Sequence, residues 1–347
     1  MAEKLNIAIL GASGYTGADL VRLALGHPHL RIAALGGDSK AGLALAETFP
    51  HLGFAALPKL QRAEDIAWDG IDAAFGCLPH GASEQILSGL PQRTAVIDLS
   101  ADFRLKDPAV YAQWYGREHE SAALLPRAVY GLTEWARSKL RSARLAACPG
   151  CYPTAVLLAL LPLVQSGVIA LDEVIIDAKS GVSGAGRGLK EANLFCETGE
   201  SMQAYGVGRH RHMPEIEQEL GAAAGRDVRI NFTPHLAPMS RGELVTCHVR
   251  LQPGRTLQDA RDALRASSKD EPFVHLAPVG LSPSTRHVRG SNHCLINVFE
   301  DRIPGRIIVI AVIDNLVKGS AGQALQNCNV MFGFPETAGL LQAPLFP

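Results

Sequence analysis

A chain of 347 residues is long enough for two domains that each bury a hydrophobic core. Its formal net charge of −1 gives no global field that would favour nucleic acid or an anionic membrane. A hydrophobic content of 47% is typical of a folded globular chain and excludes an intrinsically disordered one.

The sequence predicts a cytoplasmic protein. The apolar stretch near the N-terminus ends at Gly11 and is not followed by the small-residue cleavage site of a signal peptide. The longest apolar run, at 154–164, contains Pro162 and is too short to span a bilayer. Seven cysteines, an odd number, are typical of thiols in a reducing compartment.

Strands and helices alternate in the first half of the chain. Apolar runs of strand length lie at 5–10, 31–37, 71–78 and 95–100, and a helical pattern, ADLVRLAL, follows the first of them. This alternation predicts an α/β fold with a Rossmann-type, doubly wound parallel sheet.

Gly11, Gly14 and Gly17 form a G-x-x-G-x-x-G loop between the first strand and the first helix. The first spacing differs from G-x-G-x-x-G, but the physical reason for glycine is the same. Without side chains in the way, backbone N–H groups can meet a pyrophosphate at the N-terminus of a helix. Because the triplet stands between a strand and a helix, it predicts a dinucleotide site.

The pattern becomes richer in strands after about residue 148. ELVTCHVRL alternates, with Val245, Cys247, Val249 and Leu251 on one face, and CLINVFE and RIIVIAVID are further strands. A capped helix, TLQDARDALRASS, precedes these last two strands. The sequence therefore predicts a second, α+β catalytic domain with a mixed or antiparallel sheet covered by helices on one side.

Cys148 and Cys151 form a CxxC motif with three interpretations: a zinc half-site, a redox pair, or a nucleophile with an incidental neighbour. A structural zinc site needs four ligands, and the chain has no second CxxC, although the HRH sequence at 210–212 would allow a mixed site. A thioredoxin-like pair would follow the first strand of a small βαβ unit. The nucleophile is the favoured interpretation, and no metal site is predicted.

Cys151 is the better placed of the two cysteines. It stands directly before YPTAVLLALL, where Pro153 suits an early helical position. A cysteine at a helix N-terminus feels the positive end of the helix dipole, which lowers the pKa of the thiol and favours the reactive thiolate. Cys148 lies a turn earlier and has no such placement.

Short motifs rich in glycine and in polar or reactive side chains occur along the chain: GASGYTG, LPHG, DLSADFR, YGLTE, PGCYPTA, SGVSGAGR, HRHMPE, TPHLAPMSRGEL, GSNHC and DNLVKGSAGQALQN. In this order they resemble the N-acetyl-γ-glutamyl-phosphate reductase family of arginine biosynthesis, of the aspartate-semialdehyde dehydrogenase-like superfamily. The resemblance implies a dinucleotide-binding domain at 1–148 and a catalytic and dimerisation domain at 149–314. A C-terminal segment, 315–347, is expected to return to the first domain.

The resemblance also implies the activity. An NADP-dependent oxidoreductase, a phosphorylating aldehyde dehydrogenase, would reduce N-acetyl-γ-glutamyl phosphate to the 5-semialdehyde and phosphate through a cysteine thioester. The expected partner is this small-molecule acyl phosphate, with no nucleic acid and no membrane. The chain is expected to form a homodimer or a homotetramer.

Catalytic roles are assigned to Cys151 and to the histidine motif. Histidine titrates near neutrality, and by resemblance either His210 or His212 serves as the acid–base group, with His210 preferred. Cys148 departs from the asparagine that the family usually carries at this position. Four other histidines stand in turn-like or charged surroundings and are expected at the surface: His27, His29, His51 and His119.

The substrate carries a phosphate and a carboxylate and therefore requires cationic donors. Arg104, Ser180 and Arg187 are the predicted substrate contacts, and Ser183 and Gly184 offer further donors to phosphate. The predicted cofactor contacts are Gly11, Ser13, Gly14, Tyr15, Thr16, Gly17, Ser39, Lys40, Pro79, Ser183, Gly184 and Asn315. Of these, Asn315, together with Gly319, resembles the segment that contacts the nicotinamide.

NADP is the cofactor that the resemblance implies. A dinucleotide fold marks NAD preference by an acidic residue after the second strand, and NADP preference by a cation or hydroxyl there. Asp38 stands where the family often has arginine, whereas Ser39 and Lys40 would bind a 2′-phosphate.

Three alternatives stay open at this point. One is a semialdehyde dehydrogenase for a related acyl phosphate, either aspartyl or N-acetyl-aminoadipyl, including a carrier-bound one. Another is a non-catalytic dinucleotide sensor with the same fold. The last is a redox or zinc protein that uses Cys148 and Cys151.

Overall fold

The computed structural model describes residues 4–346, which fall into two compact units. The first unit contains residues 4–150 and 320–342, and the second contains 151–319 and 343–346. The chain thus leaves the first unit two residues later than the predicted boundary and returns to it at Ser320. Its last described residues belong to the second unit.

The first unit is built on a sheet of seven parallel strands in the order β3-β2-β1-β4-β5-β7-β6. The strands are β1 (Leu5–Leu10), β2 (Leu30–Gly36), β3 (Leu60–Gln61), β4 (Ala73–Gly76), β5 (Ala95–Asp98), β6 (Ala128–Tyr130) and β7 (Leu145–Ala147). The order reverses between β1 and β4, and such a point in an open α/β sheet is where ligands bind. The predicted doubly wound sheet is confirmed.

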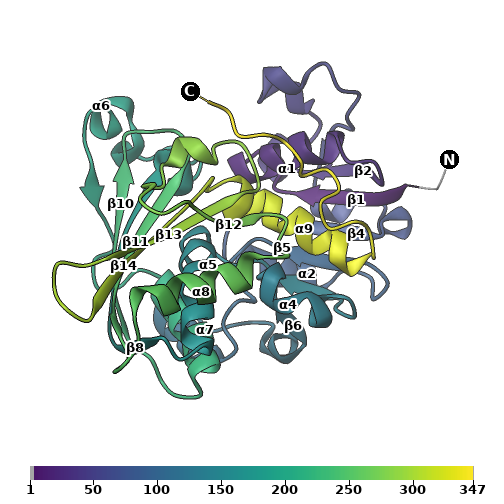
Figure 1. Ribbon diagram of the computed structural model, residues 1–347. Helices are drawn as coiled ribbons and strands as arrows, with labels where there is room; N and C mark the ends of the chain where they lie inside the picture. The colour runs from purple at the N-terminus through teal and green to yellow at the C-terminus, as the bar shows by residue number, and fades with distance from the viewer. Residues whose placement is uncertain (1–3, 347) are drawn as a thin grey trace. The chain divides into compact units, whose positions relative to one another are not determined.

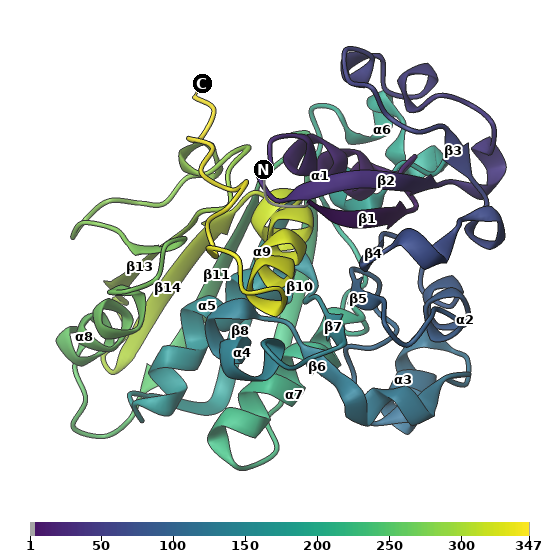
Figure 2. The same ribbon diagram turned by 90° about the vertical axis from the view of Figure 1, so that its right-hand side faces the viewer.

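Both faces of this sheet are covered, which explains its continuous apolar strands. The helices are α1 (Tyr15–Leu25), α2 (Ala82–Ser88), α3 (Pro108–Tyr115), α4 (Thr133–Leu140) and α9 (Gly322–Met331). Helix α9 packs against α1, α4 and β5, and Figure 2 shows it in yellow beside α4. Ala146 packs on this side with Leu140 and Val330, whereas its neighbours Leu145 and Ala147 point to the opposite core.

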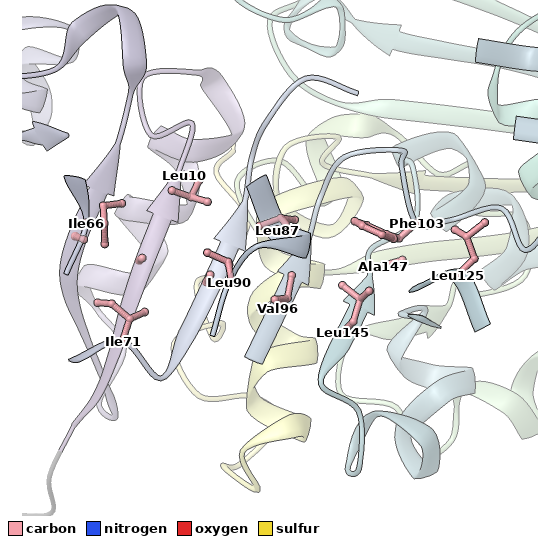
Figure 3. Packing of buried hydrophobic residues seen from close by; sticks show 13 residues of the cluster. Leu10, Ile66, Ile71, Leu87, Leu90, Val96, Phe103, Leu125, Leu145 and Ala147 are labelled. Atoms are coloured by element: carbon pink, nitrogen blue, oxygen red, sulfur yellow. The ribbon is translucent and has the colours of Figure 1, made fainter. Parts of the chain in front are cut away.

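That opposite core runs across the strands of the first unit, from Ile66 to Leu125 in Figure 3. It joins Leu10, Val96 and Leu145 of the sheet to Leu87 of α2. All of these side chains are at most 6% exposed. The core therefore fixes the strand ends at which the glycine loop begins.

The second unit has a mixed sheet of seven strands in the order β12-β13-β14-β11-β8-β10-β9. The strands are β8 (Ile169–Gly181), β9 (Gln203–Ala204), β10 (Ile230–Ala237), β11 (Glu243–Leu251), β12 (Val274–Leu276), β13 (Cys294–Glu300) and β14 (Arg306–Ile313). β8 pairs in parallel with β10, and β12 with β13, while the other pairs are antiparallel. The predicted mixed sheet is confirmed.

Helices α5 (Cys151–Gln165), α7 (His212–Ala224) and α8 (Leu257–Ser268) pack on one face of this sheet, while the short α6 (Phe195–Thr198) is separate from them (Figure 1). Residues 152–163 of α5 are all buried, as expected for a helix that is apolar on every side. It contacts β8, β11 and β14 as well as α7 and α8. The residue at its first position is therefore held rigidly.

Two of the histidines expected at the surface are buried, so this prediction was wrong for them. His27 is 1% exposed and its Nε2 lies 2.9 Å from Oδ1 of Asn329 in α9. His119 is 7% exposed and its Nδ1 lies 3.1 Å from the buried carboxylate of Glu84. In both cases the partner is distant in sequence, which explains why the local surroundings were misleading.

No helix among residues 4–346 has both the length and the apolar character needed to cross a membrane.

Candidate active site

Cys151 is the first residue of α5 and is partly buried. The helix has 15 residues, so the N–H groups of its first turn and the positive end of its dipole lie next to the thiol. This environment favours the thiolate, the reactive form of cysteine. The placement at a helix N-terminus agrees with the sequence analysis, while the role as nucleophile stays a prediction.

Gly319 lies directly against Cys151. A Cβ at this position would lie 2.7 Å from the Cβ of Cys151 and 3.1 Å from Cδ1 of Ile313. Real Cβ atoms do not approach other atoms so closely, so only glycine leaves room for Cys151 in this position. This gives a physical reason for the glycine in DNLVKGSAG.

The buried cysteines offer less reactive thiols. Burial raises the pKa of Cys148 to about 12, although Nδ2 of Asn327 donates a hydrogen bond to its sulfur over 3.5 Å. Burial also raises the pKa of Cys247 to about 12. A thiol with such a pKa stays protonated at neutral pH and is a poor nucleophile. Cys148 is therefore the weaker candidate of the CxxC pair.

None of the seven cysteines, all of which lie within residues 4–346, forms a disulfide. Across the same described residues, no three His, Cys, Asp or Glu side chains gather as a metal site would require.

A carboxyl group that the sequence analysis did not single out lies beside the Cys151 thiol. Glu243, the first residue of β11, is fully buried, and neither of its oxygens has a hydrogen-bond partner of good geometry among the described residues. Burial raises its pKa to about 8, interaction with the Cys151 thiol opposes that rise, and the charge of Asp314 adds to it. The carboxyl therefore titrates close to neutral pH, where it can both hold and release a proton.

His210 and His212 lie at the start of α7, among aromatic rings. The ring of His210 has its centroid 5.9 Å from that of Tyr152, 5.2 Å from Tyr205 and 4.8 Å from His212. The hydroxyl of Tyr205 donates to the hydroxyl of Tyr152, the residue that follows Cys151, over 3.3 Å. The histidine motif and Cys151 thus share Tyr152 and Tyr205 as neighbours.

His210 is neutral and its tautomer is defined by its contacts. Burial, followed by the charge of Arg211, lowers its pKa to about 4. Its Nδ1 accepts a hydrogen bond from the backbone N–H of His212 over 3.2 Å. A neutral ring that accepts at Nδ1 carries its proton on Nε2. His210 therefore presents an N–H donor at Nε2.

Four predicted polar contacts of the second unit lie together. Nδ2 of Asn315 donates to Oγ of Ser183 over 3.0 Å, and its Oδ1 accepts from the backbone N–H of Gly242 over 2.9 Å. A Cβ on Gly184 would lie 2.9 Å from Oγ of Ser180, so these two residues are adjacent. The cluster presents hydroxyl and backbone groups near the start of β11.

Asp314 organises the turn that carries Gly319. Its Oδ1 accepts from the N–H groups of Leu316 and Val317, over 2.9 and 3.1 Å, and its Oδ2 accepts from Gly290 over 2.7 Å. The guanidinium of Arg241 lies 3.3 Å from Oδ1. The turn that follows, η10 (Val317–Ala321), is π-helical, a form often found at functional sites.

The two predicted substrate arginines differ in environment. Arg104, in the first unit, is 8% exposed, and its guanidinium donates to the carbonyl oxygens of Cys148 and Leu99, over 2.8 and 2.9 Å. These bonds fix the DLSADFR loop to the backbone that precedes the nucleophile in the chain. Arg187, in the second unit, is exposed and follows η7 (Val182–Ala185).

The glycine loop of the first unit is closely packed. Gly11 has φ of +75°, and a Cβ there would lie 2.2 Å from the carbonyl oxygen of Cys77. A Cβ on Gly17 would lie 2.4 Å from the carbonyl oxygen of Gly11. Gly14 occupies the N-cap of α1 and provides no side-chain cap, so the first N–H groups of the helix are not covered by one. This arrangement fits a pyrophosphate.

Other predicted cofactor residues surround the loop within the first unit. Tyr15 is 38% exposed, and Oγ1 of Thr16 lies 3.4 Å from Oγ of Ser320. A Cβ on Gly37 would lie 3.6 Å from Oγ of Ser13, so Ser13 is next to the end of β2. Pro79 is exposed just after β4, the strand that pairs with β1.

The residues that would select the cofactor form η1 (Asp38–Lys40), directly after β2. Asp38 and Ser39 are exposed. Nζ of Lys40 donates to Oγ1 of Thr48 over 2.8 Å, which holds the ammonium beside this turn. The structure therefore brings Ser13, Ser39 and Lys40 to the same edge of the sheet.

A glycine loop at the reversal point of one unit and a cysteine at a helix N-terminus in the other define a class, the semialdehyde dehydrogenases. Residues 6–143 match the family model of the semialdehyde dehydrogenase NAD-binding domain, and residues 151–315 match that of the dimerisation domain. Within this class, the chain belongs to the N-acetyl-γ-glutamyl-phosphate reductase family, as the sequence motifs predicted.

Full-length relatives show that the chain belongs to this family. The chain is 56% identical to the N-acetyl-γ-glutamyl-phosphate reductase of Rhodospirillum rubrum, with 100% of each chain covered. It is 52% identical to the probable chloroplastic N-acetyl-γ-glutamyl-phosphate reductase of Arabidopsis thaliana, with 99% of this chain and 86% of the relative covered.

Solved structures share the fold. Aspartate semialdehyde dehydrogenase II of Vibrio cholerae, complexed with ASA, superposes with a TM-score of 0.71 at 16% identity and covers 96% of this chain and 99% of its own. Aspartate semialdehyde dehydrogenase of Candida albicans, solved with NADP, gives 0.66 at 17% identity, with 95% and 99% covered. At these identities the likeness concerns the fold alone.

Proposed function

We propose that the chain reduces N-acetyl-γ-glutamyl phosphate to N-acetylglutamate 5-semialdehyde and phosphate, with Cys151 as the nucleophile. The observation that carries the proposal is the position of the Cys151 thiol, at the N-terminus of a buried helix and beside the Glu243 carboxyl. The names of the full-length relatives support the same substrate.

Each side chain would have a distinct role in the reaction. The sulfur of Cys151 forms a C–S bond to the acyl carbon, and the C–O bond to phosphate breaks with its electron pair leaving on the phosphate. Nε2–H of His210 donates to the departing oxygen. Hydroxyls of Ser180 and Ser183 bind the phosphate, and Arg104 and Arg187 bind the anionic ends of the substrate.

The glycine loop, with Ser13, Tyr15 and Thr16, would hold the pyrophosphate of the dinucleotide. Bound there, the nicotinamide supplies the hydride for reduction of the thioester.

The reverse reaction gives the sharpest test of the substrate. With phosphate and NADP⁺ present, we expect kcat/KM for N-acetylglutamate semialdehyde to exceed that for aspartate semialdehyde by about a hundredfold or more. N-acetyl-aminoadipate semialdehyde serves as the comparison for one more methylene. A preference for either comparison substrate, or turnover without phosphate, would overturn the proposed function.

We also propose NADP as the cofactor, with Ser39 and Lys40 at the 2′-phosphate. Lys40→Ala removes a charge-assisted contact and should lower kcat/KM for NADPH by about ten- to a hundredfold, while the value for NADH changes little. Thr48→Val, which removes the hydroxyl bound to Lys40, is the matched control for turn geometry. Equal kcat/KM for NADPH and NADH in the wild type would show that Asp38 governs the choice.

The arginine assignments predict separate kinetic effects. Arg187→Ala should lower kcat/KM by about ten- to a hundredfold, because a charge-assisted hydrogen bond is worth roughly 1.5–3 kcal/mol. A loss confined to KM would indicate uniform binding, whereas a lower kcat would indicate that Arg187 orients the acyl phosphate. Arg62→Ala, which removes an exposed arginine paired with Glu64, is the control. Kinetics equal to that control would make Arg187 a surface charge.

Arg104→Ala should lower kcat/KM by the same factor and also lower the melting temperature, since the side chain holds the carbonyl groups of Cys148 and Leu99.

We further propose a cytoplasmic homodimer or homotetramer assembled through the second unit. Light scattering of the purified protein measures the number of subunits directly.

A further inference from the structure

Glu243 combines properties that are unusual for a structural carboxyl. It is fully buried, and its oxygens have no hydrogen-bond partner of good geometry among residues 4–346. Its sheet partner Ile313 and the Cβ of Cys151 lie against the same glycine, Gly319, and the Cys151 thiol influences its pKa. Because burying a polar group without a partner is costly, such exceptions in native proteins usually have a functional explanation.

The backbone around Glu243 is held on both sides. In the sheet, Glu243 pairs with Ser180 of β8 and with Ile313 of β14. Its neighbour Gly242 donates its N–H to Oδ1 of Asn315 over 2.9 Å. The carboxyl therefore has a fixed position relative to Cys151, whose helix packs against β11 and β14.

His210 is poorly suited to receive the thiol proton. Nδ1 of His210 already accepts from the N–H of His212, so Nε2 carries a proton and acts as a donor. Receiving a proton at Nε2 would require loss of that hydrogen bond. The thiol proton therefore needs another acceptor within reach.

Burial brings the pKa of Glu243 towards the range in which thiols titrate. The pKa of Glu243 is raised to about 8 by burial, and an ordinary thiol has a pKa of about 8.5. Moving a proton between groups of similar pKa costs little free energy. The other ionisable groups that act on Glu243 or on its neighbours are Tyr152, Tyr205 and Asp314, the last paired with Arg241. Burial keeps both tyrosines protonated through this pH range.

We propose that Cys151 and Glu243 form a coupled pair that shares one proton, and that Glu243 receives the thiol proton when Cys151 attacks the substrate. This assignment rests on the proposed function for its substrate and on the described contacts for its chemistry. Because Glu243 would exchange a proton with the reacting sulfur, the proposal makes it a catalytic residue.

The proton and electron balance is simple. On attack, the S–H bond breaks, the sulfur electron pair forms the C–S bond, and the carboxylate of Glu243 becomes a carboxylic acid. The C–O bond to phosphate breaks and its pair leaves with the phosphate. When the aldehyde departs, the C–S bond breaks, its pair returns to sulfur, and Glu243 returns the proton.

The experiment is the pH profile of Cys151 alkylation by iodoacetamide, followed by mass spectrometry of the Cys151 peptide. In a coupled pair, ionisation of one group opposes ionisation of the other, so the wild type should show two steps. Glu243→Gln keeps the shape of the side chain but cannot hold the proton. It should show one step and, at pH 9, alkylation faster by about three- to tenfold because a like charge is lost.

Internal controls are present in the same sample. The exposed Cys196 should react equally in both proteins, and the buried Cys148 should stay slow in both. Glu243→Asp keeps a carboxyl group and should keep the two steps, which preserves the test if Glu243→Gln does not fold. Melting temperatures establish folding for each variant.

Superimposable profiles in the wild type and Glu243→Gln would overturn the proposal, because they would show that the two groups titrate independently. A parallel slowing at every pH would also overturn it, since it would indicate a structural role alone. Alkylation requires no substrate, so the result stands even if the chain proves to reduce a different acyl phosphate.

Discussion

Replacing Cys151 by serine should lower reductase activity by at least about a thousandfold, while dinucleotide binding is unchanged. A serine hydroxyl ionises far less readily than a thiol and cannot use the helix dipole to reach a reactive form at neutral pH. The glycine loop lies in the first unit, so dinucleotide affinity should stay within about twofold. Fluorescence titration with NADPH and a steady-state assay measure the two quantities.

Cys148→Ser is the matched control for this prediction. Serine can still accept the hydrogen bond from Nδ2 of Asn327, and the buried Cys148 thiol is not expected to react. Most activity should therefore be retained. Comparable losses in the two variants, or stoichiometric zinc in the purified wild type, would revive the paired-thiol or metal interpretation of CPGC.

Gly17→Ala should weaken dinucleotide binding by about ten- to a hundredfold. The added methyl carbon would lie 2.4 Å from the carbonyl oxygen of Gly11 and 2.7 Å from Cα of Ala12, both backbone atoms. The loop must move to relieve this overlap, and overpacking of this kind typically costs about 1–3 kcal/mol. Calorimetric titration with NADPH measures the affinity, and thermal melting measures the cost to stability.

Gly26→Ala in the same helix separates a local steric effect from a general effect of removing glycine. Gly26 is the C-cap of α1 with φ of −88°, and its added methyl would lie 3.7 Å from the carbonyl oxygen of Leu23, an ordinary contact. Its affinity for NADPH should match the wild type. If Gly17→Ala also binds normally, the glycine loop is not the pyrophosphate site.

Much of this architecture could be predicted because the relevant signals are local. Alternating strands and helices specify a parallel sheet, and a glycine triplet between a strand and a helix marks the dinucleotide loop whatever the rest of the chain does. The place of Cys151 at a helix N-terminus could be predicted in the same way, from the residues that immediately follow it. The resemblance to a known family added the order of the motifs.

Glu243 was missed, although the sequence contained a hint. It has the same two-residue phase as Val245, Cys247 and Val249, whose face of β11 is buried, so its carboxyl had to be buried as well. That it meets Cys151 could not be read locally, because the pairing of β11 with β8 and β14 decides what it faces. His27 was misjudged for the same reason, since its partner Asn329 lies 302 residues away.

The return of residues 320–342 to the first unit has a consequence for biosynthesis. Oγ1 of Thr133 donates to Oδ1 of Asn327 over 2.6 Å, across 194 residues of sequence, and Nδ2 of Asn327 donates to the carbonyl of Gly131 over 2.8 Å. These buried bonds cannot form until α9 has left the ribosome. The N-terminal unit, although translated first, can therefore be completed only after residues 151–319 have been made, and until then its sheet lacks the cover that α9 provides. A chaperone that acts on the nascent chain would bind this incomplete first unit.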